Sequence, residues 1–229
     1  MKKATVTRQK IPPQIKFLKT NESHCLVEFG TGEIDRERTV ANPKEILDFW
    51  LDEVGTEGWY MSTKELDATI SDRFGAAWAR AATGEYSDWV CCPDKSLALI
   101  ILLDQFPRNM FRNDGRAFSS DRKALCYAKT AIDKGFDMRV PEPQRQFYYM
   151  PLMHSESLTD QERCVRLFKK RMPEGGETSL LHAKAHRDVI RRFGRFPYRN
   201  DALARQTTSV EVAYLDAGGY SESVRQMQA

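Results

Sequence analysis

The sequence predicts an all-α domain, an antiparallel array of helix pairs, with a short N-terminal extension. From Asn42 onward, apolar residues recur at the three- and four-residue spacing of helices that bury one face. Capping residues precede several of these segments, and glycine or proline follows them. The connections are short, which is typical of antiparallel helices packed on their neighbours. We therefore expect an extension over 1–41 and a helical domain over 42–229.

The composition argues against a membrane-spanning, secreted or disulfide-rich protein. The 229 residues are 41% hydrophobic and 29% charged, and the formal net charge of +3 requires neither nucleic acid nor a membrane as partner. The longest apolar run, Leu97–Leu103, is far shorter than the roughly 20 residues of a membrane-spanning helix. The basic N-terminus lacks the apolar stretch of a signal peptide, and the cysteines show no CxxC spacing. We expect a cytoplasmic protein that uses no disulfide, metal or cofactor.

The N-terminal extension differs from the rest of the chain. Residues 25–29 and 38–40 have the character of short strands on either side of a glycine-rich turn at 30–32. The segment is therefore either a small hairpin or an arm without regular structure.

The first helices of the domain are marked by their caps. The pair Asn42-Pro43 is a cap followed by proline at the first helical position. A second helix follows a capping box that begins at Ser62, and Gly84 ends it. A third covers about 94–107 and is apolar on all sides, so we expect it at the centre of the core.

The second half of the domain continues the pattern. Proline, glycine or a capping residue bounds each segment, and Thr159 with Glu162 forms a capping box. The expected helices cover about 120–134, 143–152, 159 onward, 179–193 and 209–215.

Dense polar residues interrupt the helical pattern in three segments. The first, 104–109, places a carboxylate, amides and a guanidinium directly after the most apolar helix. The second, 150–156 followed by 160–163, puts a histidine two residues from a carboxylate in an irregular connection, a common location for functional residues. The third, 186–200, surrounds a glycine and a proline with arginines. Burying such groups unpaired costs several kcal/mol, so they must find partners.

These segments resemble a bacterial family catalogued as domain of unknown function 924. The resemblance covers about 42–206 and implies a tetratricopeptide-like helical fold, without an established reaction. Two places depart from the family pattern: Tyr198, where histidine is frequent, and 204–208. The strings that carry the resemblance are Leu-Leu-Asp-Gln-Phe-Pro-Arg-Asn at 102–109, His-Ser-Glu at 154–156, Asp-Gln-Glu-Arg at 160–163, His-Arg-Asp at 186–188 and Arg-Phe-Gly-Arg-Phe-Pro-Tyr-Arg-Asn at 192–200.

The main functional hypothesis is a pocket for a small anionic molecule where the polar segments meet. An arginine presents a planar fork to a carboxylate or phosphate, and amides and carboxylates orient the rest of a ligand. The alternative is a network of ion pairs and caps that only joins helices. The expected ligand-binding residues are Asp104, Gln105, Arg108, Asn109, Arg187, Arg195 and Asn200.

An enzyme is one form of this hypothesis. His154 or His186 would carry a proton, because imidazole titrates near neutral pH, and Glu156 would orient His154. His154 could instead cap a helix end. His182 and His186 have the i, i+4 spacing of a metal site, but no HExxH string accompanies them, so we expect no metal.

Two further functions belong to other classes. A tetratricopeptide-type array would bind a peptide or protein partner on its concave face. The arginines within 187–205, with interleaved aromatic residues, could contact RNA, or they could form a solvated face balanced by acidic residues.

Overall fold

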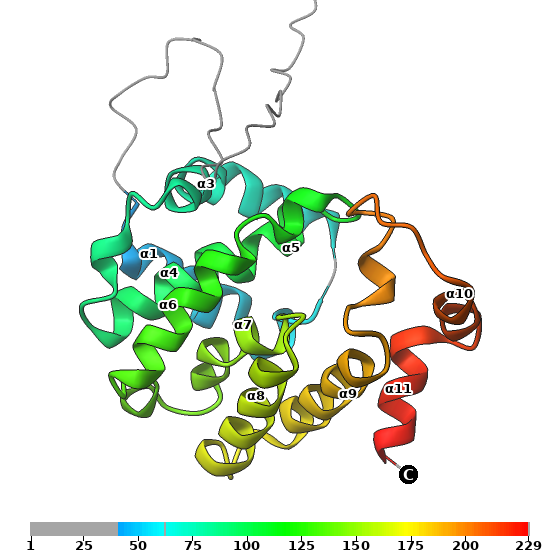
Figure 1. The fold of residues 1–229 in the computed structure, drawn as a ribbon. Coiled ribbons are helices and arrows are strands. Elements are labelled where there is room, and N and C mark those ends of the chain that lie inside the picture. Colours follow the sequence, from blue (N-terminus) through cyan, green and yellow to red (C-terminus); the bar gives the residue numbers. More distant parts are fainter. Residues whose placement is uncertain (1–40, 62, 229) are drawn as a thin grey trace, which may run out of the picture. The chain divides into compact units, whose positions relative to one another are not determined.

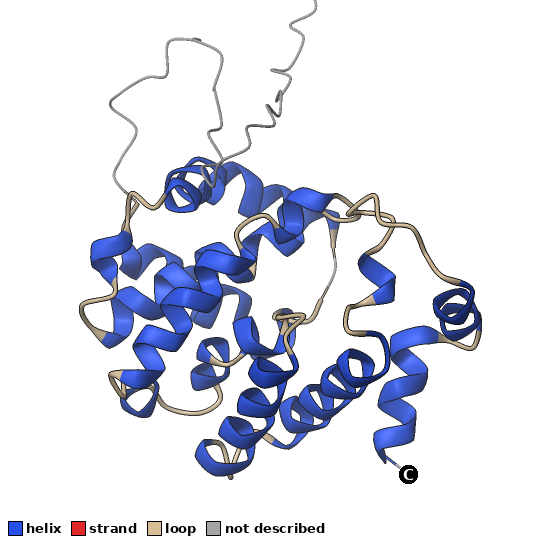
Figure 2. Ribbon diagram, viewed as in Figure 1, coloured by secondary structure: helices blue, strands red, loops and turns tan. Residues whose placement is uncertain are grey.

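A computed structural model describes residues 41–61 and 63–228. Every regular element in this part of the chain is helical and none is a strand, so the all-α prediction is confirmed (Figure 2). None of the described helices is both long and apolar enough to cross a membrane. The expected hairpin within 1–41 lies outside the described residues, and the tetratricopeptide-like arrangement stays a prediction.

The domain begins with a helical segment that is not regular throughout. Helix α1 (Pro43–Leu47) continues into a π-helical stretch, Asp48–Val54, and then into the single turn α2 (Gly55–Gly58). The side chain of Asn42 accepts a hydrogen bond from the Lys44 amide at 3.0 Å, as expected of the N-cap.

Helix α3 (Lys64–Thr83) follows and shows how local signals set helix ends. The Thr63 hydroxyl caps its first turn by accepting from the Leu66 amide at 3.1 Å. The expected cap at Ser62 lies outside the described residues. Gly84 ends the helix at a φ of +100°, a conformation that glycine adopts without steric cost.

Helix α4 (Pro93–Asp104) lies at the centre of the core, as predicted. Every residue from Ser96 to Asp104 is buried. The helix packs against α1, α3 and α6 (Asp121–Asp133). Pro107 does not end α4, because the chain turns earlier, at Gln105. The proline instead lies in the first turn of α5 (Phe106–Met110), where its missing N–H is tolerated.

Helices α7, α8 and α9 complete the core around α4. Helix α7 (Met150–Met153) is a single turn, and α8 (Leu158–Arg171) packs along α9 (Glu177–Phe193), as Figure 1 shows. The capping box expected at Thr159 is wrong, because α8 starts at Leu158 and its N-cap is Ser157. Short 3-10 turns join the helices at Ser87–Trp89, Gly115–Phe118, Asp137–Arg139, Gln144–Tyr148 and Pro197–Arg199.

Two helices close the described chain. Helix α10 (Ser209–Asp216) begins with a capping box between Thr208 and Glu211. Helix α11 (Gly219–Gln228) packs on α9 and has no counterpart in the sequence prediction. Its polar composition and the adjacent glycines Gly218 and Gly219 at its start are typical of a loop, so the few apolar residues of the helix did not predict it.

Candidate functional site

A cavity of about 520 Å³ is lined by three of the four histidines of the chain. Its walls come from the end of the first helical segment, from α7 and α9, and from the start of α11. Among the described residues, no Asp, Glu, Lys or Arg side chain lines it. The lining residues are Thr56, Trp59, Tyr60, Pro143, Gln146, Met150, Met153, His154, Gly175, Thr178, Ser179, His182, His186 and Tyr220.

The end of the central helix and the end of α7 bring a carboxylate and a histidine together. Asp104 is fully buried, and the Nδ1 atom of His154 lies 2.9 Å from its Oδ1 and 3.0 Å from its Oδ2. Burial alone would raise the pKa of Asp104, but the positive charge of Arg108 and the interaction with His154 outweigh it and lower the pKa to about 2. An ionised carboxylate can only accept, so Nδ1 of His154 carries a proton.

The protonation state of His154 follows from its surroundings. Burial lowers its pKa below the usual value, and the positive charge of Arg108 adds to the effect against the opposing influence of Asp104. The imidazole is therefore neutral at pH 7. Because Asp104 occupies Nδ1, Nε2 is the nitrogen left for a molecule in the cavity.

Arg108 balances the buried charge beside the cavity. Its Nη1 lies 3.4 Å from Oδ1 of Asp104 and 3.0 Å from Oδ1 of Asp121. Arg199 adds a second guanidinium, 3.5 Å from Asp121. Two arginines and two aspartates therefore neutralise one another, and Arg108 does not line the cavity.

The two amides of the first polar segment join this region to its neighbours. Gln105 donates to Oδ2 of Asp104 at 2.5 Å, which adds to the support of the carboxylate. Asn109 donates to Asp67 on α3 at 3.0 Å. Gln105 thus acts next to the site, whereas Asn109 connects α5 to α3.

Helices α9 and α11 contribute a second polar cluster to the cavity. The Tyr220 hydroxyl lies 2.7 Å from Nδ1 of His182 and 3.0 Å from Nδ1 of His186. Nδ1 of His186 also lies 2.9 Å from the His182 carbonyl oxygen, which can only accept. Nδ1 of His186 therefore carries a proton, and Tyr220 can donate its own proton to His182.

His186 is held neutral even in acid. Burial, reinforced by the nearby His154, lowers its pKa to about 3. The ring centroids of His154 and His186 are 6.3 Å apart. The cavity thus contains two neutral imidazoles whose Nε2 atoms both carry lone pairs.

Glu156 has a different partner from the one expected. It accepts hydrogen bonds from the Phe196 amide at 2.9 Å and from Arg205 at 2.8 and 3.0 Å. It therefore fixes the chain after α9, and Asp104 holds the position next to His154 that the sequence suggested for Glu156. The spacing of two residues was misleading because the chain turns between His154 and Glu156.

The other expected ligand-binding residues each contact a carboxylate. Arg187 pairs with Glu162 at 3.3 Å, and Arg195 pairs with Glu211 at 2.6 Å. Asn200 is buried and donates to Glu211 at 3.4 Å. None of these three side chains lines the histidine cavity.

Sequence reasoning missed several residues of the cavity wall. Trp59, Met150 and Met153 carry no chemical motif, and their apolar character indicates only a core. Tyr220 was missed together with its helix. A signal for Tyr220 would have been the recurrence of apolar residues along α11.

Comparison with known proteins places the chain in a family. A family model described as a bacterial protein of unknown function, DUF924, matches residues 46–219. The chain belongs to this family. The matched range contains Asp104 and all three cavity histidines, and it ends one residue before Tyr220. The family resemblance that the three polar segments indicate is therefore confirmed.

One solved structure has a similar fold. A protein of unknown function from Agrobacterium tumefaciens is 40% identical, with a TM-score of 0.71, over 76% of this chain and 97% of that chain. A search of curated proteins found no match.

Proposed function

We propose that this DUF924 protein is an enzyme that binds a small uncharged molecule in the histidine-lined cavity and uses His154 as a general base. The observation that carries the proposal is the hydrogen bond between buried Asp104 and Nδ1 of His154, in a histidine that lines the cavity. A carboxylate in this position selects the tautomer whose Nε2 can accept a proton.

The chemistry follows from the Asp104–His154 pair. Nε2 of His154 would take a proton from a substrate or from a water molecule that attacks it. The imidazolium that forms is stabilised by Asp104, which lies 2.9 Å away and stays ionised. A positioned base of this kind contributes about 10²- to 10⁴-fold to a rate.

The lining of the cavity favours an uncharged ligand. A volume of about 520 Å³ suits a small molecule. Trp59 and the two methionines offer apolar contact, and Gln146 and Tyr220 offer directional hydrogen bonds. The arginines expected to bind an anion are each paired with a carboxylate and do not line the cavity, so we do not retain the anionic ligand for it.

RNA binding through the arginines of 187–205 has less support. Each arginine of that segment lies within 4.0 Å of a carboxylate in the structure, so the segment offers little unbalanced charge. Nothing specific favours a peptide partner on one face of the helices. The cavity is therefore the better-supported site.

Turnover of unknown compounds can be measured directly. Purified protein is incubated with a small-molecule extract of the cells that produce it, and mass spectrometry identifies compounds that it depletes. We expect His154→Gln to slow the depletion of the same compound at least about 100-fold. Arg122→Ala, an exposed change on α6, should have no effect.

Two results would contradict the proposal. Depletion by His154→Gln at the wild-type rate would exclude His154 as the base. Compounds that the protein binds but does not alter would make it a binding protein. Thermal unfolding of each variant shows that a lost activity is not a lost fold.

A further inference from the structure

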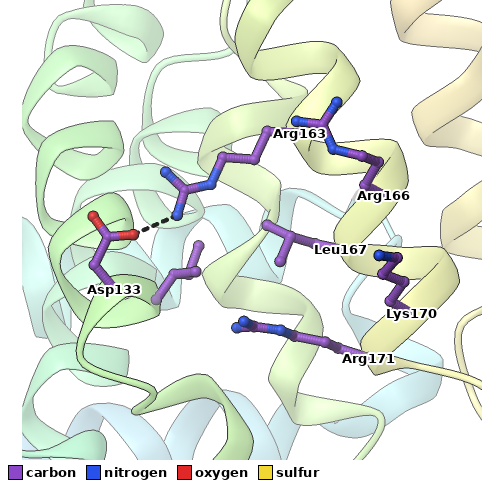
Figure 3. Close-up of a pocket in the computed structure, with 7 residues that line it drawn as sticks. Asp133, Arg163, Arg166, Leu167, Lys170 and Arg171 are labelled. Atoms are coloured by element: carbon purple, nitrogen blue, oxygen red, sulfur yellow. Dashed lines mark hydrogen bonds and ion pairs between the residues drawn. The ribbon is translucent and has the colours of Figure 1, made fainter.

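A second hollow, separate from the histidine cavity, lies where the end of α6 meets the face of α8 (Figure 3). We call it the basic groove. Its volume is about 430 Å³, and it shares no lining residue with the histidine cavity. Ile132 and Leu167 give it an apolar part, and Asp133 is its one acidic residue.

Helical spacing gathers four cationic side chains in the basic groove. Arg163, Arg166 and Lys170 of α8 are separated by three and four residues, which places them on one helix face, and Arg171 lies at its edge. The lining residues carry a formal charge of +3, which Asp137, the partner of Arg171, reduces to +2.

Two of the four cations are fixed in place by aspartates. Arg163 pairs with Asp133 on α6 at 2.6 Å. Arg171 pairs with Asp137 at 2.7 Å, and Asp137 is fully buried. These pairs hold two guanidinium groups on either side of Leu167, as Figure 3 shows, so an incoming anion meets an ordered site.

The other two cations lack such partners. Arg166 and Lys170 are exposed, and no carboxylate of the described residues lies within 4.0 Å of either. Figure 3 shows both on the same helix face. The positive charges of Arg166 and Lys170 are not balanced and repel each other, and an anion with several charges would relieve that repulsion.

We propose that the basic groove binds a compact soluble anion that carries two or more adjacent phosphate groups. Guanidinium groups bind phosphate oxygens in pairs, and lysine adds a point charge. The groove is concave and small, which fits a free polyphosphate better than the flat surface of a membrane. It has no aromatic side chain on which a nucleobase could stack, so recognition would depend on the phosphates.

The test is calorimetric titration of the full chain with inorganic tripolyphosphate at about 0.15 M salt. We expect binding by the wild type, and weaker binding of orthophosphate because it offers fewer charges. The double variant R166A/K170A should bind tripolyphosphate on the order of tenfold more weakly. The control K64A/R122A removes one lysine and one arginine that are also exposed, on α3 and α6, and should bind like the wild type.

The remaining outcomes would overturn the proposal. Absence of binding at this salt concentration would do so. An equal loss in both double variants would show attraction by net charge alone. Binding of anionic lipid vesicles or of RNA, without binding of tripolyphosphate, would assign the groove to a different partner. His154→Gln should leave tripolyphosphate binding unchanged, which keeps this test separate from that of the proposed enzyme.

Discussion

Asp104 holds the Nδ1 atom of His154 at 2.9 Å, although 50 residues separate the two in sequence. The apolar helix α4 carries the aspartate into the core, and the single turn α7 ends directly before the histidine. This contact fixes both the tautomer of the imidazole and the buried charge next to it.

The first prediction concerns that tautomer. Because Asp104 can only accept, the wild-type protein at pH 7 should show His154 protonated on Nδ1 and unprotonated on Nε2. Nitrogen-15 NMR of the imidazole rings measures this, and His154→Gln assigns the signals. A His154 ring protonated on Nε2 would remove its role as a base.

Replacing Asp104 by asparagine should destabilise the fold. The change removes a buried negative charge and leaves Arg108 with only Asp121 as counter-ion. We expect the free energy of unfolding, measured in urea, to fall by about 3 kcal/mol. Asp48→Asn is the matched control, since its pair with Lys44 is exposed, and it should cost less than about 0.5 kcal/mol. If both changes lowered the free energy of unfolding equally, the buried pair of Asp104 and Arg108 would contribute no more to stability than the exposed pair of Asp48 and Lys44.

Glu156 is predicted to stabilise the fold without affecting the imidazole. Its carboxylate accepts from Arg205 and from the Phe196 amide. Glu156→Ala should lower the free energy of unfolding by about 2 kcal/mol, as the loss of hydrogen bonds to a charged group does. The NMR signals of His154 should stay where they are. A change in the protonation of His154 would restore the pairing that the sequence suggested.

Local features of the fold could be predicted from the sequence, and long-range ones could not. The burial of α4 follows from its unbroken apolar run, and Gly84 and Gly194 end their helices because they adopt positive φ. The choice of Asp104 over Glu156 as the partner of His154 depends on how α4 packs against α7. That packing is a tertiary property, and proximity in sequence is a poor guide to it.

The same distinction separates the cavity from its expected residues. His154 and His186 were identified because imidazole titrates near neutral pH, whereas His182 was considered only as a metal ligand. Arg187 and Arg195 were grouped with Arg108 because all three lie in polar segments, but different carboxylates hold them in different places. The aromatic and methionine walls could not be distinguished from core by their residue types.

The burial of His186 should make the stability of the folded protein depend on pH in the acid range. Its pKa is about 3 in the folded protein and 6.5 in an unperturbed side chain, so between these values the unfolded chain binds a proton that the folded protein does not. Stability therefore falls as the pH falls from about 6.5 towards 3. His186→Asn should reduce that slope by about 1.4 kcal/mol per pH unit. Urea unfolding at pH 4.5, 5.0 and 5.5 measures it, and an unchanged slope would show that His186 titrates normally.

Tyr220 is predicted to join α11 to the histidines of α9. Tyr220→Phe removes the hydroxyl that lies 2.7 Å from His182 and 3.0 Å from His186. We expect this change to lower the free energy of unfolding by about 1 kcal/mol. Tyr214→Phe is the matched control, because its hydroxyl meets Ser223 at 3.0 Å within α10 and α11 and does not line the cavity.

Both tyrosine variants should lower the melting temperature by similar amounts, but only Tyr220→Phe should shift the imidazole signals of His182 and His186. Tyr220→Phe should also weaken the binding of any ligand found in the cavity, because Tyr220 forms part of the wall. If both variants left the imidazole signals unchanged, α11 would only cover α9. If Tyr220→Phe alone shifted them, the helix that the sequence did not reveal would set the protonation of two histidines in the candidate site.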